Sequence, residues 1–361
     1  MRAILAAGGT AGHINPAVAI AKKIAADGGE VLFIGNENGM EFELVPKEGF
    51  KIEGIKVSGF KRSLSPKNIK TAWQAMRGIA KTKKIIRDFK PDIVIGCGGY
   101  VSGPAVYSAS MMKIPTLIHE QNAFPGMTTK ILSRVVNKIC VSFEDSIKYI
   151  GHKEKIIVTG NPLRENILAV TYDEARERLG LTKPTVLVFG GSLGAKKIND
   201  TMTDMIPALG NDIEIIWGTG KRYFDEITEK LKSAEISENI KIVPYIYNMD
   251  EVMSGADIVV SRAGAITLGE ICAKGKAAVL IPSPYVTHNH QEYNARALEK
   301  KGAAIIIGEN DLSAPLLKKT LLELAADKGR LERMQKNALS LSRADAADVI
   351  YAEICKLTHK H

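Results

Sequence analysis

Short apolar runs alternate with longer segments of helical periodicity along most of the chain. The runs predict strands at positions 3–7, 31–34, 93–95, 116–118, 138–141, 186–189, 213–217, 240–243, 258–260 and 278–281. Apolar strands that alternate with helices are typical of parallel sheets covered by helices. The pattern therefore predicts an α/β protein built on parallel sheets.

A glycine-rich loop follows the first predicted strand, and a similar loop follows the strand at 186–189. The two loops are Gly8-Gly9-Thr10-Ala11-Gly12 and Gly190-Gly191-Ser192-Leu193-Gly194. Each has two glycines, a hydroxyl residue, a spacer and a further glycine. We expect the helix after the first loop to carry Pro16 in its first turn and the helix after the second to span 195–209.

This repeat predicts two doubly wound, Rossmann-like domains. We place them at 1–161 and 164–342, joined by the turn-rich segment 159–164. Open parallel sheets bind ligands at the carboxyl ends of their strands. Two such domains side by side therefore predict a cleft that holds the functional site.

Glycine loops between a strand and a helix favour phosphate binding, although a glycine can also simply permit a tight turn. A third loop, at 96–103, follows the predicted strand at 93–95 and strengthens the phosphate interpretation. No GxxxxGK[ST] motif is present, and Val101 stands where GxGxxG needs a third glycine. The sequence therefore disfavours a P-loop ATPase and a nicotinamide dehydrogenase.

The second loop also fits the GxSxG motif of a serine hydrolase. In that interpretation Ser192 is the nucleophile, followed by Asp257 and by His288 or His290 in the chain order of an α/β hydrolase. The first loop repeats this motif, with Thr10 in place of the serine. A duplicated phosphate loop explains both copies, so the hydrolase remains the weaker alternative.

Polar residues that follow other predicted strands are further candidates. A helix that begins near Ala265 would direct its amides at a ligand, and Glu270 could accept hydrogen bonds from a ribose or merely complement the helix dipole. Gln291 and Asn294 suit hydroxyl groups. The histidines of 287–296 lack the spacing of a zinc site.

Two histidines are candidates for a base. His13 stands at the mouth of the first glycine loop, and His119 follows the predicted strand at 116–118. A neutral imidazole can take a proton near pH 7, whereas a charged one would bind an anion.

The chain of 361 residues is 45% hydrophobic, which is enough for two ordinary cores. It shows neither a run of about 18 apolar residues nor a signal peptide, so we expect a cytoplasmic protein. Its four cysteines, Cys97, Cys140, Cys272 and Cys355, fit no zinc or disulfide pattern. We expect them to be reduced.

The net charge of +9 is concentrated in one window, at 56–90, which holds eleven Lys or Arg and one acid. A helix from Pro66 would carry an apolar stripe of Ile69, Trp73, Met76 and Ala80 between basic residues. This layout, at 61–84, suits an anionic membrane surface, although a stripe of this kind can also face a core. No nucleic-acid-binding motif accompanies the charge, so we expect no nucleic-acid partner.

Seven motifs in order along nearly the whole chain closely resemble the MurG family of peptidoglycan N-acetylglucosaminyltransferases, in glycosyltransferase family 28. They are GGTAGH, GCGGYVSGP, HEQNAFPG, GNPLR, GGSLGA, SRAGAITLGE and HNHQEYNA. The resemblance implies the GT-B fold, two Rossmann-like domains separated by a cleft, with a C-terminal helix at 343–361 that crosses back to the first domain. The first domain would face the acceptor and the membrane, and the second would bind the donor.

The resemblance also implies the reaction. Such an enzyme transfers N-acetylglucosamine from UDP-N-acetylglucosamine to the C4 hydroxyl of undecaprenyl-pyrophosphoryl-muramoyl-pentapeptide, with inversion. It works at the cytoplasmic face of the membrane as a peripheral protein, without a cofactor or a required metal. A UDP-sugar epimerase and a glycolipid glycosyltransferase of the same fold are the rival activities.

Matching motif positions assign the site residues. Their roles are as follows: His13 the base; Thr10, Ala11, Gly12 and Asn122 the donor-sugar side; Arg164, Ser192, Ala265, Ile266 and Thr267 the diphosphate; Ile246 the uracil, through its backbone; Glu270 the ribose; Gln291 the sugar hydroxyls; and Leu268 and Gly269 further substrate-binding residues. Two positions depart from the family pattern. Ala11 replaces a glycine, and Glu292 stands where some relatives have a second Gln.

Overall fold

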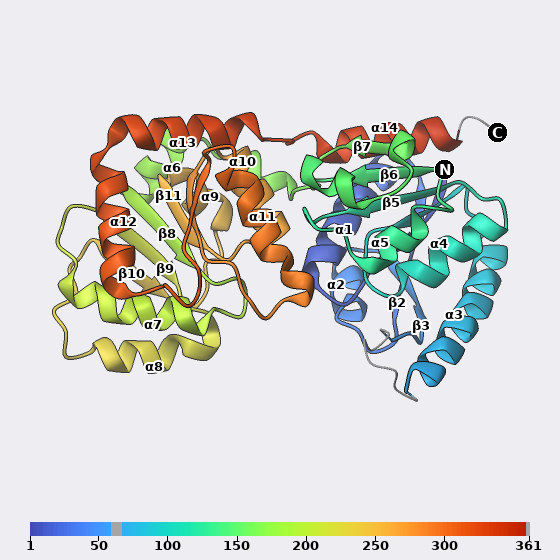
Figure 1. Cartoon of the computed structure of the whole chain (residues 1–361), viewed down its shortest axis with the longest axis horizontal. Helices are drawn as coiled ribbons and strands as arrows, with labels where there is room; N and C mark the ends of the chain where they lie inside the picture. The colour runs from blue at the N-terminus through green and yellow to red at the C-terminus, as the bar shows by residue number, and fades with distance from the viewer. Residues whose placement is uncertain (59–66, 359–361) are drawn as a thin grey trace. The chain divides into compact units, whose positions relative to one another are not determined.

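Two parallel sheets with helices on both faces make up the computed structural model, which describes residues 1–58 and 67–358 (Figure 1). The chain divides into two compact units, Met1–Arg164 together with Arg343–His361, and Glu165–Ser342. The described strand pairs of both sheets are parallel. The predicted α/β class with two doubly wound domains is confirmed.

The first unit contains a seven-stranded sheet in the order β3-β2-β1-β4-β5-β6-β7. Its strands are β1 (Arg2–Ala6), β2 (Glu30–Asn36), β3 (Lys51–Ile55), β4 (Ile93–Gly96), β5 (Thr116–Glu120), β6 (Lys138–Val141) and β7 (Ile156–Val158). The strand order reverses between β1 and β4, so the loops after these two strands lie at the switch point where open sheets bind ligands.

Helices cover both faces of this sheet. One face packs on α1 (Ala11–Ala26), α2 (Glu41–Lys47) and α14 (Ala346–Thr358), and the other on α3 (Lys67–Phe89), α4 (Ser102–Met111) and α5 (Met127–Leu132). The short 3₁₀ helices η1 (Glu144–Tyr149) and η2 (Lys153–Lys155) precede β7. The C-terminal helix α14 belongs to the core of this unit, because its Ile350 and Ile354 are fully buried with Ile14 of α1.

The second unit contains a six-stranded sheet in the order β10-β9-β8-β11-β12-β13. Its strands are β8 (Thr185–Phe189), β9 (Glu214–Gly218), β10 (Ile240–Val243), β11 (Ile258–Ser261), β12 (Ala277–Leu280) and β13 (Ala304–Ile306). Its helices are η3 (Glu165–Leu168), α6 (Tyr172–Leu179), α7 (Lys196–Met205), η4 (Ile206–Ala208), α8 (Lys221–Leu231), α9 (Met249–Gly255), α10 (Ala265–Ala273), η5 (Thr287–Asn289), α11 (His290–Glu299), α12 (Ala314–Ala326) and α13 (Lys328–Ser340). The fully buried Trp217 of β9 lies in the core that α7, α8, α12 and α13 share with the sheet.

Every strand that the sequence predicts overlaps an observed one, but three observed strands were not predicted. These are β3, β7 and β13, and all three are edge strands. An edge strand pairs on one side only and tolerates exposed positions, as in the β3 sequence KIEGI, where alternate residues are exposed. The apolar pattern of β3 is therefore weak, whereas β7 and β13 are short apolar runs that the prediction omitted.

The predicted starts and ends of two helices were wrong. Helix α1 begins at Ala11, directly after the glycine loop, so Pro16 lies inside the helix instead of in its first turn. Pro lacks the N–H that would bond the carbonyl of Gly12, and the helix continues past this missing bond. The second predicted helix, at 195–209, ends as α-helix at Met205 and continues as the 3₁₀ helix η4.

Candidate active site

The first glycine loop and the start of α1 hold His13 in a defined orientation. Its Nδ1 lies 2.9 Å from the carbonyl oxygen of Gly8. A carbonyl oxygen only accepts hydrogen bonds, so Nδ1 carries a proton, and in the neutral form of the ring the lone pair is on Nε2. The hydroxyl of Thr10 lies 3.4 Å from the same Nδ1. The ring is partly exposed and thus accessible to a substrate hydroxyl.

The loop after β4 confines the other side of the His13 ring. A Cβ atom at Gly98 would lie 2.5 Å from Cδ2 of His13, and Gly99 packs on the Gly8 carbonyl. Both glycines have positive φ angles, of 106° and 79°, which other residues rarely adopt. Glycine in this third loop therefore permits two loops at the switch point to meet around the imidazole.

The amide of Gly9 is already paired. It donates to Oε2 of Glu41, a fully buried acid at the start of α2, at 3.2 Å. A carboxylate so close to the loop disfavours a phosphate at this amide, so the structure does not support the expected anion site at Gly9. Sequence reasoning did not single out Glu41.

A buried acid also fixes the loop that presents Asn122. Glu120 accepts hydrogen bonds from the backbone N of Asn122 at 3.0 Å, from the amide of Gly126 at 3.0 Å and from the Thr129 hydroxyl at 2.6 Å. The side chain of Asn122 is partly exposed at the carboxyl end of β5.

The alternative base His119 is 1% exposed. Its Nε2 lies 3.0 Å from the carbonyl oxygen of Gly160, and its Nδ1 lies 3.0 Å from Nε2 of Gln121. Burial lowers the pKa of His119 to about 4, although the hydrogen bond with the Gly160 carbonyl raises this pKa in part. This histidine is a neutral structural group, and His13 is the better candidate for a base.

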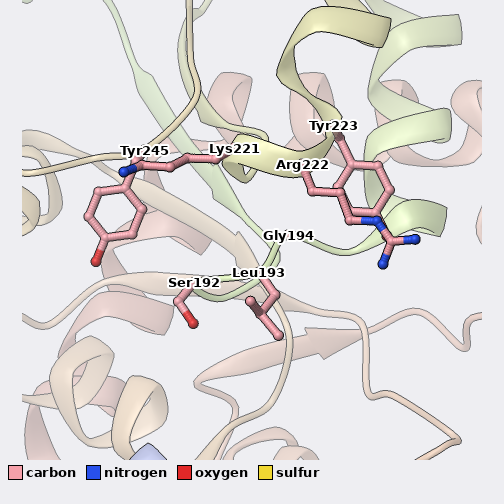
Figure 2. Close-up of a pocket in the computed structure, with 7 residues that line it drawn as sticks. All are labelled: Ser192, Leu193, Gly194, Lys221, Arg222, Tyr223 and Tyr245. Atoms are coloured by element: carbon pink, nitrogen blue, oxygen red, sulfur yellow. The ribbon is translucent and has the colours of Figure 1, made fainter. Parts of the chain in front are cut away.

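In the second unit a pocket of about 620 Å³ lies beside the second glycine loop (Figure 2). It is lined by Ser192, Leu193, Gly194, Lys221, Arg222, Tyr223 and Tyr245. Figure 2 shows the Lys221 side chain extended toward the Tyr245 ring, and its ammonium lies 6.0 Å from that ring's centroid and 5.7 Å from that of Tyr247. Cations and aromatic rings beside a glycine loop suit a ligand that combines an anion with a flat base.

Ile246 follows the pocket residue Tyr245 in the chain. Its side chain is buried, and a Cβ atom at Gly218 would lie 3.0 Å from its Cδ1. Because the side chain packs into the sheet, a ligand can meet this residue only through main-chain groups.

Helix α10 begins at Ala265, as the sequence predicts, and its N-cap residue, Gly264, forms no side-chain cap. Ile266, Thr267 and Gly269 are partly exposed, whereas Ala265 and Leu268 are buried. Glu270 is the sixth residue of the helix and only 4% exposed. An acid that merely complements the helix dipole would face solvent, so this burial favours the binding interpretation of Glu270.

The side chains of α11 separate into binding and structural groups. Gln291 is partly buried, and its Oε1 accepts a hydrogen bond from the amide of Ser283 at 2.9 Å, which leaves its amide group to donate. Asn294 was expected to meet hydroxyl groups, but it is fully buried and donates to the carbonyl of Ala263 at 3.2 Å. Glu292 pairs with Arg296 at 2.8 Å.

The serine hydrolase alternative is wrong. Ser192 follows the carboxyl end of β8, whereas Asp257 immediately precedes β11, which runs parallel to β8. The two residues therefore stand at opposite ends of the sheet. Asp257 is also engaged by Arg176 at 3.2 Å and by the Tyr172 hydroxyl at 2.8 Å.

Models of two protein domains match the chain. The glycosyltransferase family 28 N-terminal domain matches residues 3–141, and the glycosyltransferase family 28 C-terminal domain matches residues 185–350. The chain belongs to glycosyltransferase family 28. The N-terminal domain match falls within the first unit, whereas the C-terminal domain match covers most of the second unit and ends at residue 350, in the C-terminal segment that belongs to the first unit.

Curated family 28 relatives match over the full length. A UDP-N-acetylglucosamine--N-acetylmuramyl-(pentapeptide) pyrophosphoryl-undecaprenol N-acetylglucosamine transferase from Thermoanaerobacter sp. is 49% identical, and the match covers 99% of this chain and 100% of the relative. A protein of the same name from Clostridioides difficile is 44% identical, over 99% of this chain and 89% of the relative.

Solved structures agree on the fold. The crystal structure of Acinetobacter baumannii MurG superposes with a TM-score of 0.82 at 28% identity and covers 98% of this chain and 99% of its own. A UDP-GlcNAc 2-epimerase from Neisseria meningitidis, with a TM-score of 0.67 at 16% identity, covers 99% of this chain and 100% of its own and shares the fold. The two folds are alike, so fold alone does not separate this family 28 chain from an epimerase.

The apolar stripe predicted on α3 does not face the core. Trp73 is 52% and Met76 is 61% exposed, whereas the opposite face of the helix buries Ile85 and Ile86. The guanidinium of Arg77 lies 4.2 Å from the centroid of the Trp73 ring. The basic residues Lys61 and Arg62 lie outside the described part of the chain, as do the side chains of Lys67, Ile69 and Lys70. Within the described residues, the helices are all too short or too polar to span a bilayer.

Proposed function

We propose that this chain transfers N-acetylglucosamine from UDP-N-acetylglucosamine to the C4 hydroxyl of undecaprenyl-pyrophosphoryl-muramoyl-pentapeptide, with inversion at the anomeric carbon. The observation that carries the proposal is the full-length match, at 49% identity, to a transferase named for this reaction. The orientation of His13 supports it, because the reaction needs a base that faces an attacking hydroxyl.

In this proposal the second unit binds the donor. The backbone of Ile246 meets the uracil, Glu270 accepts from the ribose hydroxyls, and Gln291 binds hydroxyls of the sugar. Ser192 and Arg164 bind the diphosphate together with the first turn of α10, at Ala265, Ile266 and Thr267. Leu268 and Gly269 are further substrate-binding residues of the same helix. The burial of Glu270 and the start of α10 directly after the loop that follows β11 support these roles.

His13 is the proposed base. The acceptor oxygen forms a bond to the anomeric carbon while its proton passes to Nε2 of His13, and the bond between that carbon and UDP breaks. The departing diphosphate takes the electron pair, and the α10 amides with Ser192 and Arg164 stabilise the negative charge that develops. Thr10, Ala11, Gly12 and Asn122 line the donor-sugar side in this scheme.

The first unit would dock on the cytoplasmic leaflet as a peripheral protein. Apolar side chains are exposed on three neighbouring helices of the same sheet face, α3, α4 and α5. They are Trp73, Met76, Tyr107, Met111, Met127 and Ile131. Shallow insertion of such side chains together with basic residues at 61–84 would hold the protein on anionic lipid, where each cation contributes about 1 kcal/mol.

Product analysis with and without a short-chain lipid acceptor tests the function. We expect UDP and the disaccharide-linked lipid to appear together, in equal amounts, only when both substrates are present. Conversion of the donor sugar without any acceptor would instead indicate an epimerase. A His13→Ala variant, which keeps the donor residues of the second unit, serves as the control for contaminating activity.

A further inference from the structure

A buried acid lies beneath the loop that holds His13. Glu41 is the first residue of α2, and its side chain is fully buried. Three glycines leave room for it: a Cβ atom at Gly35 would lie 2.6 Å from its Cγ, one at Gly39 would lie 2.5 Å from its Cδ, and one at Gly8 would collide with Oε1. The surrounding backbone is therefore shaped around this carboxylate.

The carboxylate binds two backbone amides. Its Oε1 accepts from the amide of Asn36 at 2.7 Å, and its Oε2 accepts from the amide of Gly9 at 3.2 Å. These bonds join the end of β2 to the glycine loop after β1. Hydrogen bonds to a charged acceptor are stronger than those between neutral groups, so the carboxylate fixes the loop backbone more firmly than an amide side chain would.

The amide of Gly9 and the carbonyl of Gly8 belong to the same peptide group. That carbonyl accepts the hydrogen bond from Nδ1 of His13, at 2.9 Å. Carboxylate, peptide group and imidazole thus form one continuous chain of hydrogen bonds. Such bonds polarise one another, so a negative charge at the Gly9 amide makes the Gly8 carbonyl a stronger acceptor for the imidazole N–H.

We propose that Glu41 is a positioning residue for His13 that acts through the Gly8–Gly9 peptide. It holds the neutral imidazole in the form with the proton on Nδ1, so that Nε2 presents its lone pair to the acceptor hydroxyl. In a catalytic triad a carboxylate orients the histidine by direct contact. Here Glu41 orients His13 through the intervening peptide group. The catalytic part of this inference rests on the proposed function, whereas the protonation state of the ring can be measured without it.

The decisive experiment is NMR of the full-length protein with ¹⁵N-labelled histidine, at a pH where the ring is neutral. A His13→Gln variant assigns the ring signals. In the wild type we expect Nδ1 to show the shift of a protonated nitrogen and Nε2 that of an unprotonated one. In Glu41→Gln, where an amide can accept from only one of the two backbone amides, we expect both shifts to move toward a mixture of the two forms.

A Glu353→Gln variant is the matched control. Glu353 is also a buried acid of the first unit, but it pairs at 3.0 Å with Lys138 of β6, three strands away from β1 in the sheet. We expect its His13 signals to match the wild type. The inference would be overturned if the His13 ring signals of Glu41→Gln matched those of the wild type. It would also be overturned if the ring in the wild-type protein carried its proton on Nε2.

Kinetics separates positioning from structural support. In Glu41→Gln we expect kcat to fall about 10- to 100-fold, as when an outer partner of a functional histidine is lost, with the KM for UDP-N-acetylglucosamine within about twofold. Combining Glu41→Gln with His13→Ala should lower kcat no further than His13→Ala alone. Additive losses would show that Glu41 acts independently of His13 and would refute the proposal.

A second variant covers the case in which Glu41→Gln fails to fold. In Gly8→Ala the new methyl group displaces the carboxylate from the loop, so the same shift of the ring signals is expected. If the wild type transfers no sugar at all, the proposed function fails, and the NMR result still decides whether Glu41 sets the form of the ring.

Discussion

The pH dependence of the first unit's stability offers a sharp test of the role of His119. Burial lowers the pKa of this imidazole from 6.5 to about 4, so the folded protein holds it neutral at pH 5. The unfolded chain takes up the proton near pH 6.5. The contribution of His119 to the free energy of unfolding is therefore fully present above pH 6.5. This contribution is lost as the pH falls from 6.5 to about 4 and changes no further below that pH.

The magnitude follows from the shift. A fall in pKa from 6.5 to about 4 corresponds to a total of about 3 kcal/mol. Of this, about 2 kcal/mol is lost between pH 8 and pH 5, because at pH 5 the unfolded state is almost fully protonated and the folded state is not.

His119→Gln isolates this contribution, because the glutamine amide can still donate to the Gly160 carbonyl but does not titrate. Urea unfolding of both proteins at pH 8 and pH 5, followed by hydrogen exchange of the β5 and β6 amides, reports on the first unit alone. The wild type should lose about 2 kcal/mol more than the variant over this pH range. A difference below about 0.5 kcal/mol would mean that His119 titrates normally and that its burial carries no electrostatic cost.

Four further predictions address catalysis, binding and stability. His13→Ala should lower kcat by about 10²- to 10⁴-fold with UDP affinity unchanged in calorimetry, and a loss below about threefold would remove it as the base. Glu270→Ala should weaken UDP binding, measured without added Mg²⁺, by about 1–3 kcal/mol, and unchanged affinity would place Glu270 outside the site. Ile350→Ala and Ile354→Ala should each destabilise the first unit by about 2–5 kcal/mol in urea, because both side chains are fully buried. Trp73→Ser should reduce flotation with anionic liposomes but not turnover of a water-soluble acceptor, and equal flotation would move the membrane contact elsewhere.

The central strands could be predicted from the sequence because they are buried on both faces. β1 and β8 are continuous apolar runs that end at a glycine loop, so both the strand and the site at its carboxyl end are visible in the pattern. The edge strand β13 is also an apolar run, although its isoleucines are only partly covered, so the apolar pattern alone does not explain why it was not predicted.

Which polar side chains face a ligand could not be predicted. Asn294 and Gln291 lie on one helix in a single motif, yet one is fully buried under a carbonyl and the other is partly exposed. Glu41 gave no sequence signal of its own, because it lies 32 residues from the amide that it binds. The glycines at 35 and 39 are a partial signal, because they leave space for a side chain. The sequence alone does not identify which side chain fills that space.

The two glycine loops have the same form but different electrostatic surroundings. In each unit the strand next to the loop-bearing strand is followed by a helix whose first residue is charged: Glu41 after β2 in the first unit, and Lys221 after β9 in the second. The acid is buried and binds the amide of Gly9, whereas the lysine lines the pocket beside Ser192.

This difference in sign separates the proposed roles of the two loops. A carboxylate within hydrogen-bond distance of a loop amide repels a diphosphate but supports an imidazole that must take up a proton. A lysine and a helix N-terminus beside a loop attract a diphosphate and stabilise the charge that develops as it leaves. In this proposal the loop of the first unit activates a hydroxyl and the loop of the second unit holds the nucleotide. The difference follows from the charge of one residue at the same topological position, Glu41 in the first unit and Lys221 in the second.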